Sequence, residues 1–323
     1  MGSLARVSTG RLILTFTHVP GIHRCNNGTL MISRSDNDGI TWEMPEVIDA
    51  CPQWDCVNMG GLMTFPSDHV LLAHGRLQID SRLPGDEPCT DWRLATKTSM
   101  DNGCTWCRSN SDIQLFPEWT ELYGASNPHE LTDGRHMLAV IGTSGRDAGW
   151  KAGVTFTSDH GSTFTRPNIV ATHPRLGFGD MDIVRLMDGR FLAVARVFGR
   201  QNSVFAHSSN DGSTWSQLRP TNFAGANIKL HRLRSGAVLC AYRDEQGNRT
   251  GIACSVSDDS GDSWGRVGWL AAPSEAPSAT TSFRSGYPNI VEVRPQQLGC
   301  VLHPAPDING NIDLCWIDLA DRT

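Results

Sequence analysis

The sequence predicts an all-β protein, a six-bladed β-propeller of four-stranded antiparallel blades that occupies residues 1–323 as a single domain. Two observations support this prediction. One turn motif occurs five times at intervals of roughly 50 to 60 residues, a period typical of solenoids, arrays and propellers. Between its copies, short β-type runs are paired around tight turns, and no apolar stretch has a helical period of useful length.

The turn motif, here called the box motif, reads Ser/Thr-x-Asp/Asn-x-Gly-x-Thr/Ser-aromatic. Its acid or amide bonds backbone amides of its own turn, and its glycine supplies a positive φ without steric cost. The hydroxyl groups tie the two arms together, and the aromatic ring is buried beside them. The motif therefore predicts a stiff hairpin turn and by itself indicates no function. The five copies end at Trp42, Trp106, Phe164, Trp215 and Trp264.

A second pattern precedes each box motif: a short strand, a tight turn and an apolar strand. The turns lie at 8–10, 66–68, 132–134, 187–189 and 234–236. Asp-Gly and Ser-Gly between β-rich runs are hairpin signals. A sixth unit, at 289–293 and 298–303 followed by 311–318, has no box motif. Six such units predict a propeller, because radial closure leaves no long exposed edge.

Composition argues against several classes of protein. Charged residues make up 19% of the chain and the formal net charge is −6, so nucleic acid is not an expected partner. The longest apolar runs, such as 12–16, are too short to span a bilayer. The first ten residues show no secretory signal. Two glycosylation sequons, at Asn27 and Asn248, favour an extracellular protein.

Nine of the ten cysteines fall into two groups. Four lie within β-type runs, where a buried free thiol is expected: Cys240, Cys254, Cys300 and Cys315. Five lie in or beside turns, where disulfides are more plausible: Cys51, Cys56, Cys89, Cys104 and Cys107. The spacing of this second group does not fit a zinc ribbon, so we expect no metal and no cofactor.

The topology sorts the polar residues onto two faces. The box motifs and the tight turns share one face, and the opposite face receives the start of each first strand and the end of each second strand. Because ligand sites are concave and have a few convergent polar groups, we expect a central pocket on that opposite face. A single arginine or acid at a strand end usually forms an ordinary salt bridge, but these residues are concentrated on one face. The candidates are His18, His23, Arg24, Asp55, Arg76, Glu121, Asp180, Arg196, Arg243 and Tyr287.

Over essentially its whole length the chain resembles the sialidase (neuraminidase) superfamily, also called Asp-box or BNR-repeat proteins. The segment from 178–180 to Arg196 resembles the family segment in which an acid precedes an arginine. The segment 240–243, followed by 249–252, resembles the one that bears another arginine, here Arg243. Residues 285–288 lie where the family has its tyrosine, here Tyr287.

This resemblance implies a retaining exo-glycoside hydrolase that binds carbohydrate and acts on a terminal sugar, with an acidic sugar favoured by the arginines. Arg196 and Arg243 would bind the substrate carboxylate, because a guanidinium group matches a carboxylate with two parallel bonds. Tyr287 would be the nucleophile, an exception to the usual pair of catalytic carboxylates. Asp180 would activate it, since the unperturbed pKa of tyrosine is near ~10.

The sequence departs from the family pattern at its start. The family places another arginine before the first strand, where this chain has Met1-Gly2-Ser3, and an acid/base aspartate in the loop after Thr17, where 18–24 contains no carboxylate. The candidate replacements for the acid are His18, His23, Asp55 and Glu121. The further substrate-binding candidates are Arg24, Arg76 and the same two histidines.

Three alternatives remain open at this stage. An arabinan-type exo-hydrolase on the same propeller would use two facing carboxylates such as Glu121 and Asp180. A polysaccharide lyase would use histidine, tyrosine and arginine. A propeller without catalysis would bind a glycan or a protein.

Overall fold

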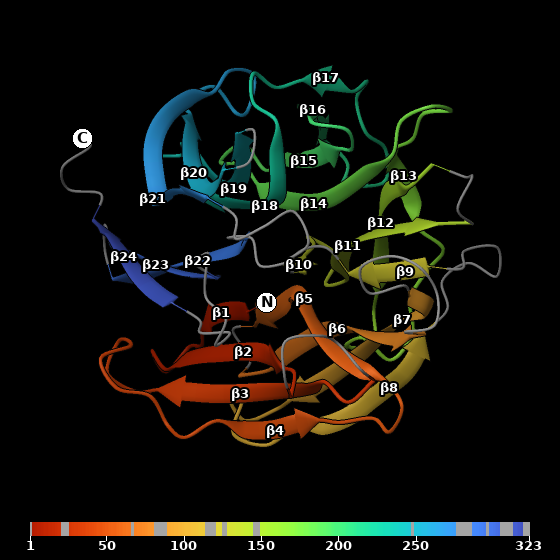
Figure 1. Cartoon of the computed structure of the whole chain (residues 1–323), viewed down its shortest axis with the longest axis vertical. Coiled ribbons are helices and arrows are strands. Elements are labelled where there is room, and N and C mark those ends of the chain that lie inside the picture. The colour runs from red at the N-terminus through yellow and green to blue at the C-terminus, as the bar shows by residue number, and fades with distance from the viewer. Residues whose placement is uncertain are drawn as a thin grey trace.

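A computed structural model of the chain describes residues 2–20, 26–65, 68–80, 89–113, 121–124, 128–144, 149–246, 249–275, 286–294, 297–303 and 313–318. The described strands form six antiparallel sheets arranged as blades around a centre, and no helix occurs among them (Figure 1). The protein is a six-bladed β-propeller, which confirms the predicted fold class. No described segment is a helix long and apolar enough to cross a membrane. The assignment of 1–323 to a single domain stays a prediction.

Four blades contain four strands each, in chain order from the centre outward. The first blade contains β1 (Gly2–Arg6), β2 (Leu12–His18), β3 (Thr29–Ser35) and β4 (Glu46–Asp49). The second contains β5 (Asp55–Thr64), β6 (Val70–Ile79), β7 (Cys89–Ser99) and β8 (Cys107–Ile113). The fourth contains β14 (Phe178–Arg185), β15 (Phe191–Val197), β16 (Gln201–Ser208) and β17 (Arg219–Pro220). The fifth contains β18 (Gly225–Arg232), β19 (Val238–Gln246), β20 (Arg249–Ser257) and β21 (Gly265–Glu275).

The third and sixth blades differ from this plan. In the third, two short strands, β9 (Glu121–Gly124) and β10 (His129–Glu130), both pair with β11 (His136–Thr143), which is followed by β12 (Lys151–Thr157) and β13 (Asn168–Ala171). The sixth blade contains β22 (Gly286–Arg294), β23 (Gln297–His303) and β24 (Asp313–Asp318). These are the three strands that the sequence predicted for the unit without a box motif.

All five box motifs form the predicted hairpin turn with one set of bonds. In the last motif, the Gly261 amide donates to Ser257 Oγ at 2.8 Å and the Ser263 amide donates to Asp259 Oδ1 at 2.8 Å. The Trp264 indole Nε1 donates to the Gly261 carbonyl at 3.0 Å. The other four motifs repeat the amide bonds with distances of 2.8 or 2.9 Å. Because these bonds lie within eight residues of chain, each motif folds locally.

The glycine of each box motif also packs on the neighbouring blade. A Cβ added at Gly261 would lie 2.6 Å from Cδ2 of Leu192, a fully buried residue of the fourth blade. The φ of Gly261 is 95°, in the region that side chains rarely adopt. Gly189, in a tight turn of the fourth blade, has a similar φ of 86° but nothing within 4 Å of the added Cβ.

We expect Gly261→Ala to be more destabilising than Gly189→Ala. Both substitutions strain the backbone, at a cost of about 1 to 2 kcal/mol. Only Gly261→Ala also overpacks Leu192, which adds about 1 to 3 kcal/mol. Urea unfolding of the two variants measures the difference. Equal losses of stability would show that the blades adjust to the added methyl group without cost.

Buried polar side chains link the first strands of neighbouring blades near the centre. Asn289 Oδ1 accepts from the Leu4 amide at 3.1 Å, which closes the ring between the sixth and first blades. Ser3 Oγ donates to Asn58 Oδ1 at 2.8 Å, and Asp182 Oδ2 accepts from the Leu230 amide at 2.7 Å. Apolar clusters fill the space between the blades outside this ring. The bonds therefore fix how the first strands lie relative to one another.

The described cysteines carry free thiols. The prediction of buried thiols is confirmed for Cys240, Cys254 and Cys300, and Cys315 is half-buried. The preference for disulfides beside turns is wrong for Cys51, Cys56, Cys104 and Cys107. Cys56 is a buried free thiol rather than half of a disulfide, because it lies wholly inside the seam between the first two blades. The side chain of Cys89 lies outside the described residues.

Candidate functional site

The fourth, fifth and sixth blades share one irregularity near the start of their first strands. In each, two residues of the first strand lie opposite one residue of the second, which is a β-bulge. The first bulge residue has a positive φ in all three blades: 43° at Asp180, 51° at Asn227 and 53° at Tyr287. Such backbone conformations cost about 1 to 3 kcal/mol for residues other than glycine and cluster at functional sites. The bulges therefore mark a candidate site.

The register of the same strands places one residue of each second strand beside the bulge, at the same height along the three blades. Gly179 pairs with Arg196, Ala226 with Arg243, and Gly286 with His303. These pairs lie at the start of a first strand and the end of a second strand. The box motifs follow the third strands, whose ends pair with the starts of the second strands, so they lie at the opposite end of the blades. The structure thus brings Asp180, Arg196, Arg243 and Tyr287 to the predicted face.

An ion pair and an amide organise the part of the site in the fourth and fifth blades. Arg196 Nη1 donates to Asp180 Oδ2 at 3.1 Å, with side chains 26% and 17% exposed. Asn227 Nδ2 donates to the other carboxylate oxygen of Asp180 at 3.4 Å. Asn227 is 6% exposed, and within the described parts of the chain its Oδ1 atom has no hydrogen-bond partner. Both oxygens of Asp180 are therefore oriented, and Asn227 keeps an acceptor available.

Sequence reasoning missed Asn227, although a signal was present. Asp180 and Arg196, Asn227 and Arg243, and Tyr287 and His303 are all separated by 16 residues. This spacing runs from the first bulge residue, around the hairpin, to the second-strand residue beside the bulge. It is the same in all three blades and therefore identifies equivalent positions. Aligning the blades on this spacing finds Asn227 in the place of Asp180 and Tyr287.

An aromatic side chain supports Arg196. The Arg196 Cζ atom lies 5.2 Å from the centroid of the Phe198 ring, an arrangement in which the ring face attracts the cation. Phe198 fits there because Gly177 and Gly179 have no side chains: a Cβ at either glycine would lie 2.7 Å from the ring. The guanidinium group is therefore held by Asp180 at its end and by Phe198 on its face.

Two of the predicted residues lie apart from this group. Arg76 is 3% exposed, and its Nη2 atom donates to Asp49 Oδ2 at 2.9 Å in the seam between the first and second blades. Asp55 is fully buried, and its Oδ1 atom accepts from the amides of Asn27 at 3.0 Å and Gly28 at 2.5 Å. Arg76 thus contributes to packing between blades, and Asp55 anchors a loop. We leave both out of the site.

The remaining candidates are only partly described. His18 ends β2 and is exposed. The backbone of Glu121 pairs with Thr143 in the third blade, but its side chain lies outside the described residues. His23 and Arg24 also lie outside them.

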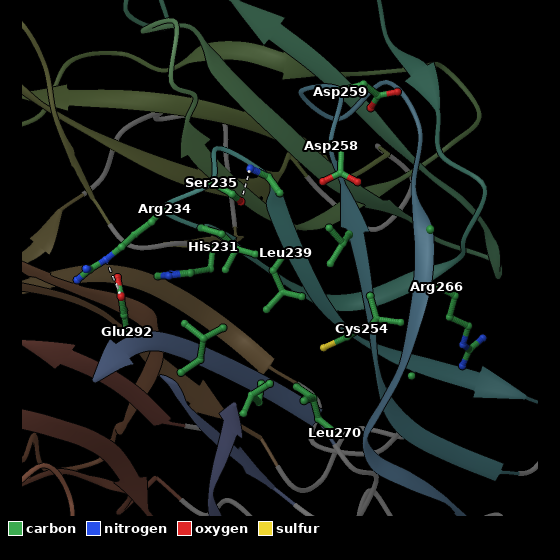
Figure 2. A pocket seen from close by; sticks show the side chains of 18 of the residues that line it. His231, Arg234, Ser235, Leu239, Cys254, Asp258, Asp259, Arg266, Leu270 and Glu292 are labelled. Atoms are coloured by element: carbon green, nitrogen blue, oxygen red, sulfur yellow. Dashed lines mark hydrogen bonds and ion pairs between the residues drawn. The ribbon is translucent and has the colours of Figure 1, made fainter. Parts of the chain in front are cut away.

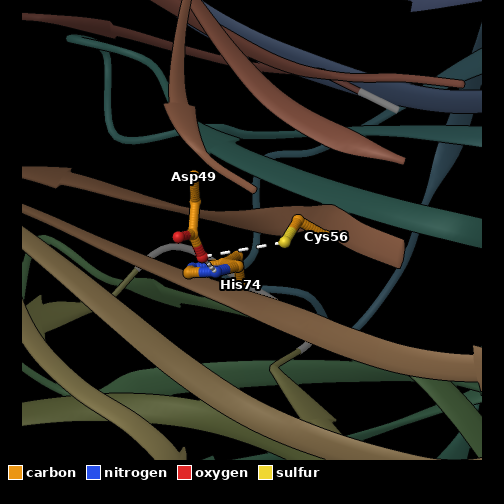
Figure 3. Close-up of side chains that lie close together, drawn as sticks. All are labelled: Asp49, Cys56 and His74. Atoms are coloured by element: carbon orange, nitrogen blue, oxygen red, sulfur yellow. Dashed lines mark hydrogen bonds and ion pairs between the residues drawn. The ribbon is translucent and has the colours of Figure 1, made fainter. Parts of the chain in front are cut away.

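The seam that contains Arg76 also contains a group of possible metal ligands, Asp49, Cys56 and His74 (Figure 3). Asp49 Oδ2 accepts from His74 Nε2 at 2.8 Å and from the Cys56 thiol at 3.7 Å. Lys97 Nζ lies 3.3 Å from Asp49 Oδ1, so two buried cations, Lys97 and Arg76, already neutralise this carboxylate. The group fits an ionic lock between blades better than a metal site.

The pKa shifts in this seam agree with that assignment. Burial acts to raise the pKa of Asp49, but the bonds from His74 and Arg76 outweigh it and hold the pKa well below its usual range. Burial raises the pKa of the Cys56 thiol to about 12 and lowers the pKa of His74. At neutral pH the group therefore contains a carboxylate, a thiol and a neutral imidazole.

A cavity of about 940 Å³ lies between the fifth and sixth blades (Figure 2). Its apolar lining includes Leu239, Cys254 and Leu270, and at its edge Arg234 Nε lies 2.8 Å from Glu292 Oε1. Asp259 of the fifth box motif also lines it, so this cavity opens near the face opposite the bulges. It is separate from the candidate site.

Comparisons with known proteins agree with the fold and its repeats. Residues 84–300 match the family described as the BNR repeat-like domain. No curated protein matches the chain. A protein of unknown function from Dyadobacter fermentans DSM 18053 is similar in structure, with a TM-score of 0.80 and 18% identity over 98% of this chain and 92% of that one.

Two enzymes have the same architecture. The Hadza microbial sialidase Hz136 is similar with a TM-score of 0.74 and 18% identity, over 99% of this chain and 65% of that one. The intramolecular trans-sialidase from Ruminococcus gnavus, solved with oseltamivir carboxylate, has a TM-score of 0.73 and 13% identity over 99% of this chain and 94% of that one. At these identities the likeness is one of fold. With five box motifs and a family match over most of its length, the chain belongs to the BNR repeat-like family.

Proposed function

We propose that the protein is a sialidase-like exo-glycoside hydrolase whose site contains Asp180, Arg196, Asn227, Arg243 and Tyr287. One observation carries the proposal. The same bulge presents an acid, an amide and a tyrosine on three successive blades, and two of the facing second-strand positions are arginines. Strained backbone and cationic side chains thus occur together at one level of the propeller.

The two arginines are proposed to bind a substrate carboxylate. Guanidinium groups are always charged and form parallel pairs of bonds with carboxylates. Phe198 and Asp180 fix the orientation of Arg196 before substrate binds, so little ordering entropy is lost on binding. The unpartnered Oδ1 atom of Asn227 would accept a bond from a sugar hydroxyl or amide group.

The proposed reaction begins with attack by Tyr287 on the anomeric carbon. A phenol is a weak nucleophile at neutral pH, so its proton passes to a base, here Asp180. The glycosidic bond breaks as the tyrosyl–sugar bond forms. Water then attacks the anomeric carbon and releases Tyr287, so the configuration is retained overall; the group that protonated the leaving oxygen takes a proton from this water, and Asp180 returns its proton to the tyrosine oxygen. A neutral nucleophile also avoids repulsion by the substrate carboxylate.

The leaving group needs a proton from a separate acid. Of the predicted donors with described side chains, His18 is exposed at the end of β2, whereas Asp55 is fully buried. His18 is therefore the better candidate on the described part of the chain. A protonated imidazole can donate its proton to the leaving oxygen as a general acid.

A hydrolysis screen tests this function. Fluorogenic sialosides, arabinosides and uronides are incubated with the protein at several pH values between about 5 and 8. We expect turnover of sialosides. If only a neutral sugar is hydrolysed, the arginines do not bind a substrate carboxylate. If none of the glycosides is hydrolysed, the protein is not a hydrolase of these substrates.

A binding propeller without catalysis is the second candidate. It is favoured by the segment after Thr17, because residues 18–24 contain no carboxylate that could act as the acid. Binding of the protein to sialosides on a glycan array, together with no turnover in the hydrolysis screen, would favour this candidate.

A further inference from the structure

Most seams between blades are joined near the face of the box motifs by an ion pair or a polar bond. Arg294 Nε lies 3.1 Å from Asp38 Oδ2 between the sixth and first blades. Polar pairs also join the first and second, third and fourth, fourth and fifth, and fifth and sixth blades: Ser8 with Asp68, Thr132 with Asp211, Arg219 with Asp262, and Arg234 with Glu292. Within its described part, the seam between the second and third blades is joined by a bond from the Thr96 hydroxyl group to the Gly161 carbonyl at 2.8 Å, and it also contains three histidines.

These histidines come from separate elements and meet around one phenylalanine. His69 precedes β6, His136 begins β11, and His160 lies in the third box motif at a φ of 55°. The ring centroid of His160 lies 4.4 Å from that of His69 and 6.0 Å from that of His136. Phe65 stacks on His69 at 4.7 Å and meets His136 edge-on at 4.3 Å.

Two of the three rings are buried without polar partners. His69 is 1% exposed and His136 is 4% exposed. None of their four ring nitrogens has a hydrogen-bond partner within the described ranges. A buried polar group without a partner destabilises the folded state, so four such atoms in one place need an explanation. The exposed His160 ring lies beside them, between this seam and solvent.

Both buried rings are in the protonation state that metal binding requires. Burial, assisted by the neighbouring His160 and His136, lowers the pKa of His69 to about 4. Burial likewise lowers the pKa of His136, although the charge of Glu130 opposes the shift. Each ring is therefore neutral at pH 7 and has one nitrogen lone pair available.

We propose that His69, His136 and His160 bind one divalent transition-metal ion, of the Zn²⁺, Ni²⁺ or Cu²⁺ class, between the second and third blades. Neutral imidazole is a preferred ligand of these ions, at about 2.0 to 2.1 Å for zinc. In the described chain only Asp49, Cys56 and His74 bring three ligand atoms within 4.8 Å of one another. The ligand atoms of the three histidines therefore have to move closer together on binding, and the exposed His160 ring has room to turn.

Such an ion would do at this seam what ion pairs do at the others. It would satisfy nitrogens of both buried rings and cross-link the start of β6 to the third box motif. Three protein ligands leave a fourth position for water or another small ligand. The site lies on the face of the box motifs, away from Asp180 and Tyr287, so it is independent of the proposed hydrolysis.

Calorimetric titration with ZnCl₂ tests the proposal. The full chain, without a histidine tag, is stripped with a chelator and titrated at pH 7.5. We expect one saturable site, a higher Tm with Zn²⁺, and the visible absorption of tetrahedral Co²⁺ on substitution. The variant His160→Asn should weaken Zn²⁺ binding at least about tenfold and remain folded, because asparagine occupies the same position in the second box motif, at Asn102, with a φ of 55°.

Two control variants separate this site from other binding. His207→Asn removes an imidazole from the fourth blade that already bonds the Ser260 carbonyl at 2.7 Å, so it should bind Zn²⁺ as the wild type does. Cys56→Ser alters the other group of possible ligands and should also leave binding unchanged. The proposal is overturned if no saturable binding occurs, if His160→Asn binds as tightly as the wild type, or if only Cys56→Ser loses the ion.

Discussion

Tyr287→Phe should lower kcat/KM for a sialoside by at least about a thousandfold, which corresponds to a loss of about 4 kcal/mol of transition-state stabilisation. Phenylalanine keeps the ring and removes only the hydroxyl oxygen that would form the bond to the sugar. The substitution should leave the Tm nearly unchanged, because Tyr287 is only half-buried. Initial rates with a fluorogenic sialoside, with Tm as a check on folding, measure the effect.

Tyr242→Phe is the matched control for this variant. Tyr242 lies in β19 beside Arg243, but it is 2% exposed, and its hydroxyl group contacts Ser255 Oγ at 3.2 Å inside the fifth blade. Its loss should cost about 1 kcal/mol of stability and leave kcat/KM within about threefold of the wild type. If Tyr287→Phe kept most of the activity, the proposed nucleophile would be wrong whatever the substrate.

The blades could be predicted because their signals are local. In the box motif from Ser257 to Trp264, the bonding partners are at most four residues apart, so the residues that form the turn are neighbours in the sequence. The unit without this motif was still recognised, and its strands β22, β23 and β24 lie where its β-type runs predicted them. The repeat period and the residues of the turn motif were therefore sufficient to predict the fold.

The candidate site was only partly predictable, because its geometry depends on register between strands. A bulge adds one residue to a strand and reverses the faces of all side chains beyond it. That is why Asn227 was missed although it stands in the same place as Asp180. Arg76 was placed in the pocket because it lies near the end of a second strand, but its side chain points into the seam toward Asp49. A strand position alone does not reveal which face a side chain occupies.

Asp49→Asn should produce the largest loss of stability among the substitutions considered, about 3 to 5 kcal/mol. Asp49 is 7% exposed, and its carboxylate pairs with Arg76 and Lys97, which are 3% and 8% exposed. Removing the negative charge takes away the carboxylate with which both buried cations pair, and the asparagine amide adds a donor facing them. Urea unfolding measures the loss. Asp36→Asn, which removes an exposed partner of Arg11, is the control and should change stability little.

A second variant shows whether charge rather than shape is responsible. Adding Lys97→Met to Asp49→Asn removes one of the two buried cations while preserving the volume of the side chain, so it should recover part of the lost stability. If Asp49→Asn unfolds as the wild type does, the buried group is no ionic lock. Recovery in the double variant would mean instead that the balance of buried charge around Asp49 stabilises the seam between the first two blades.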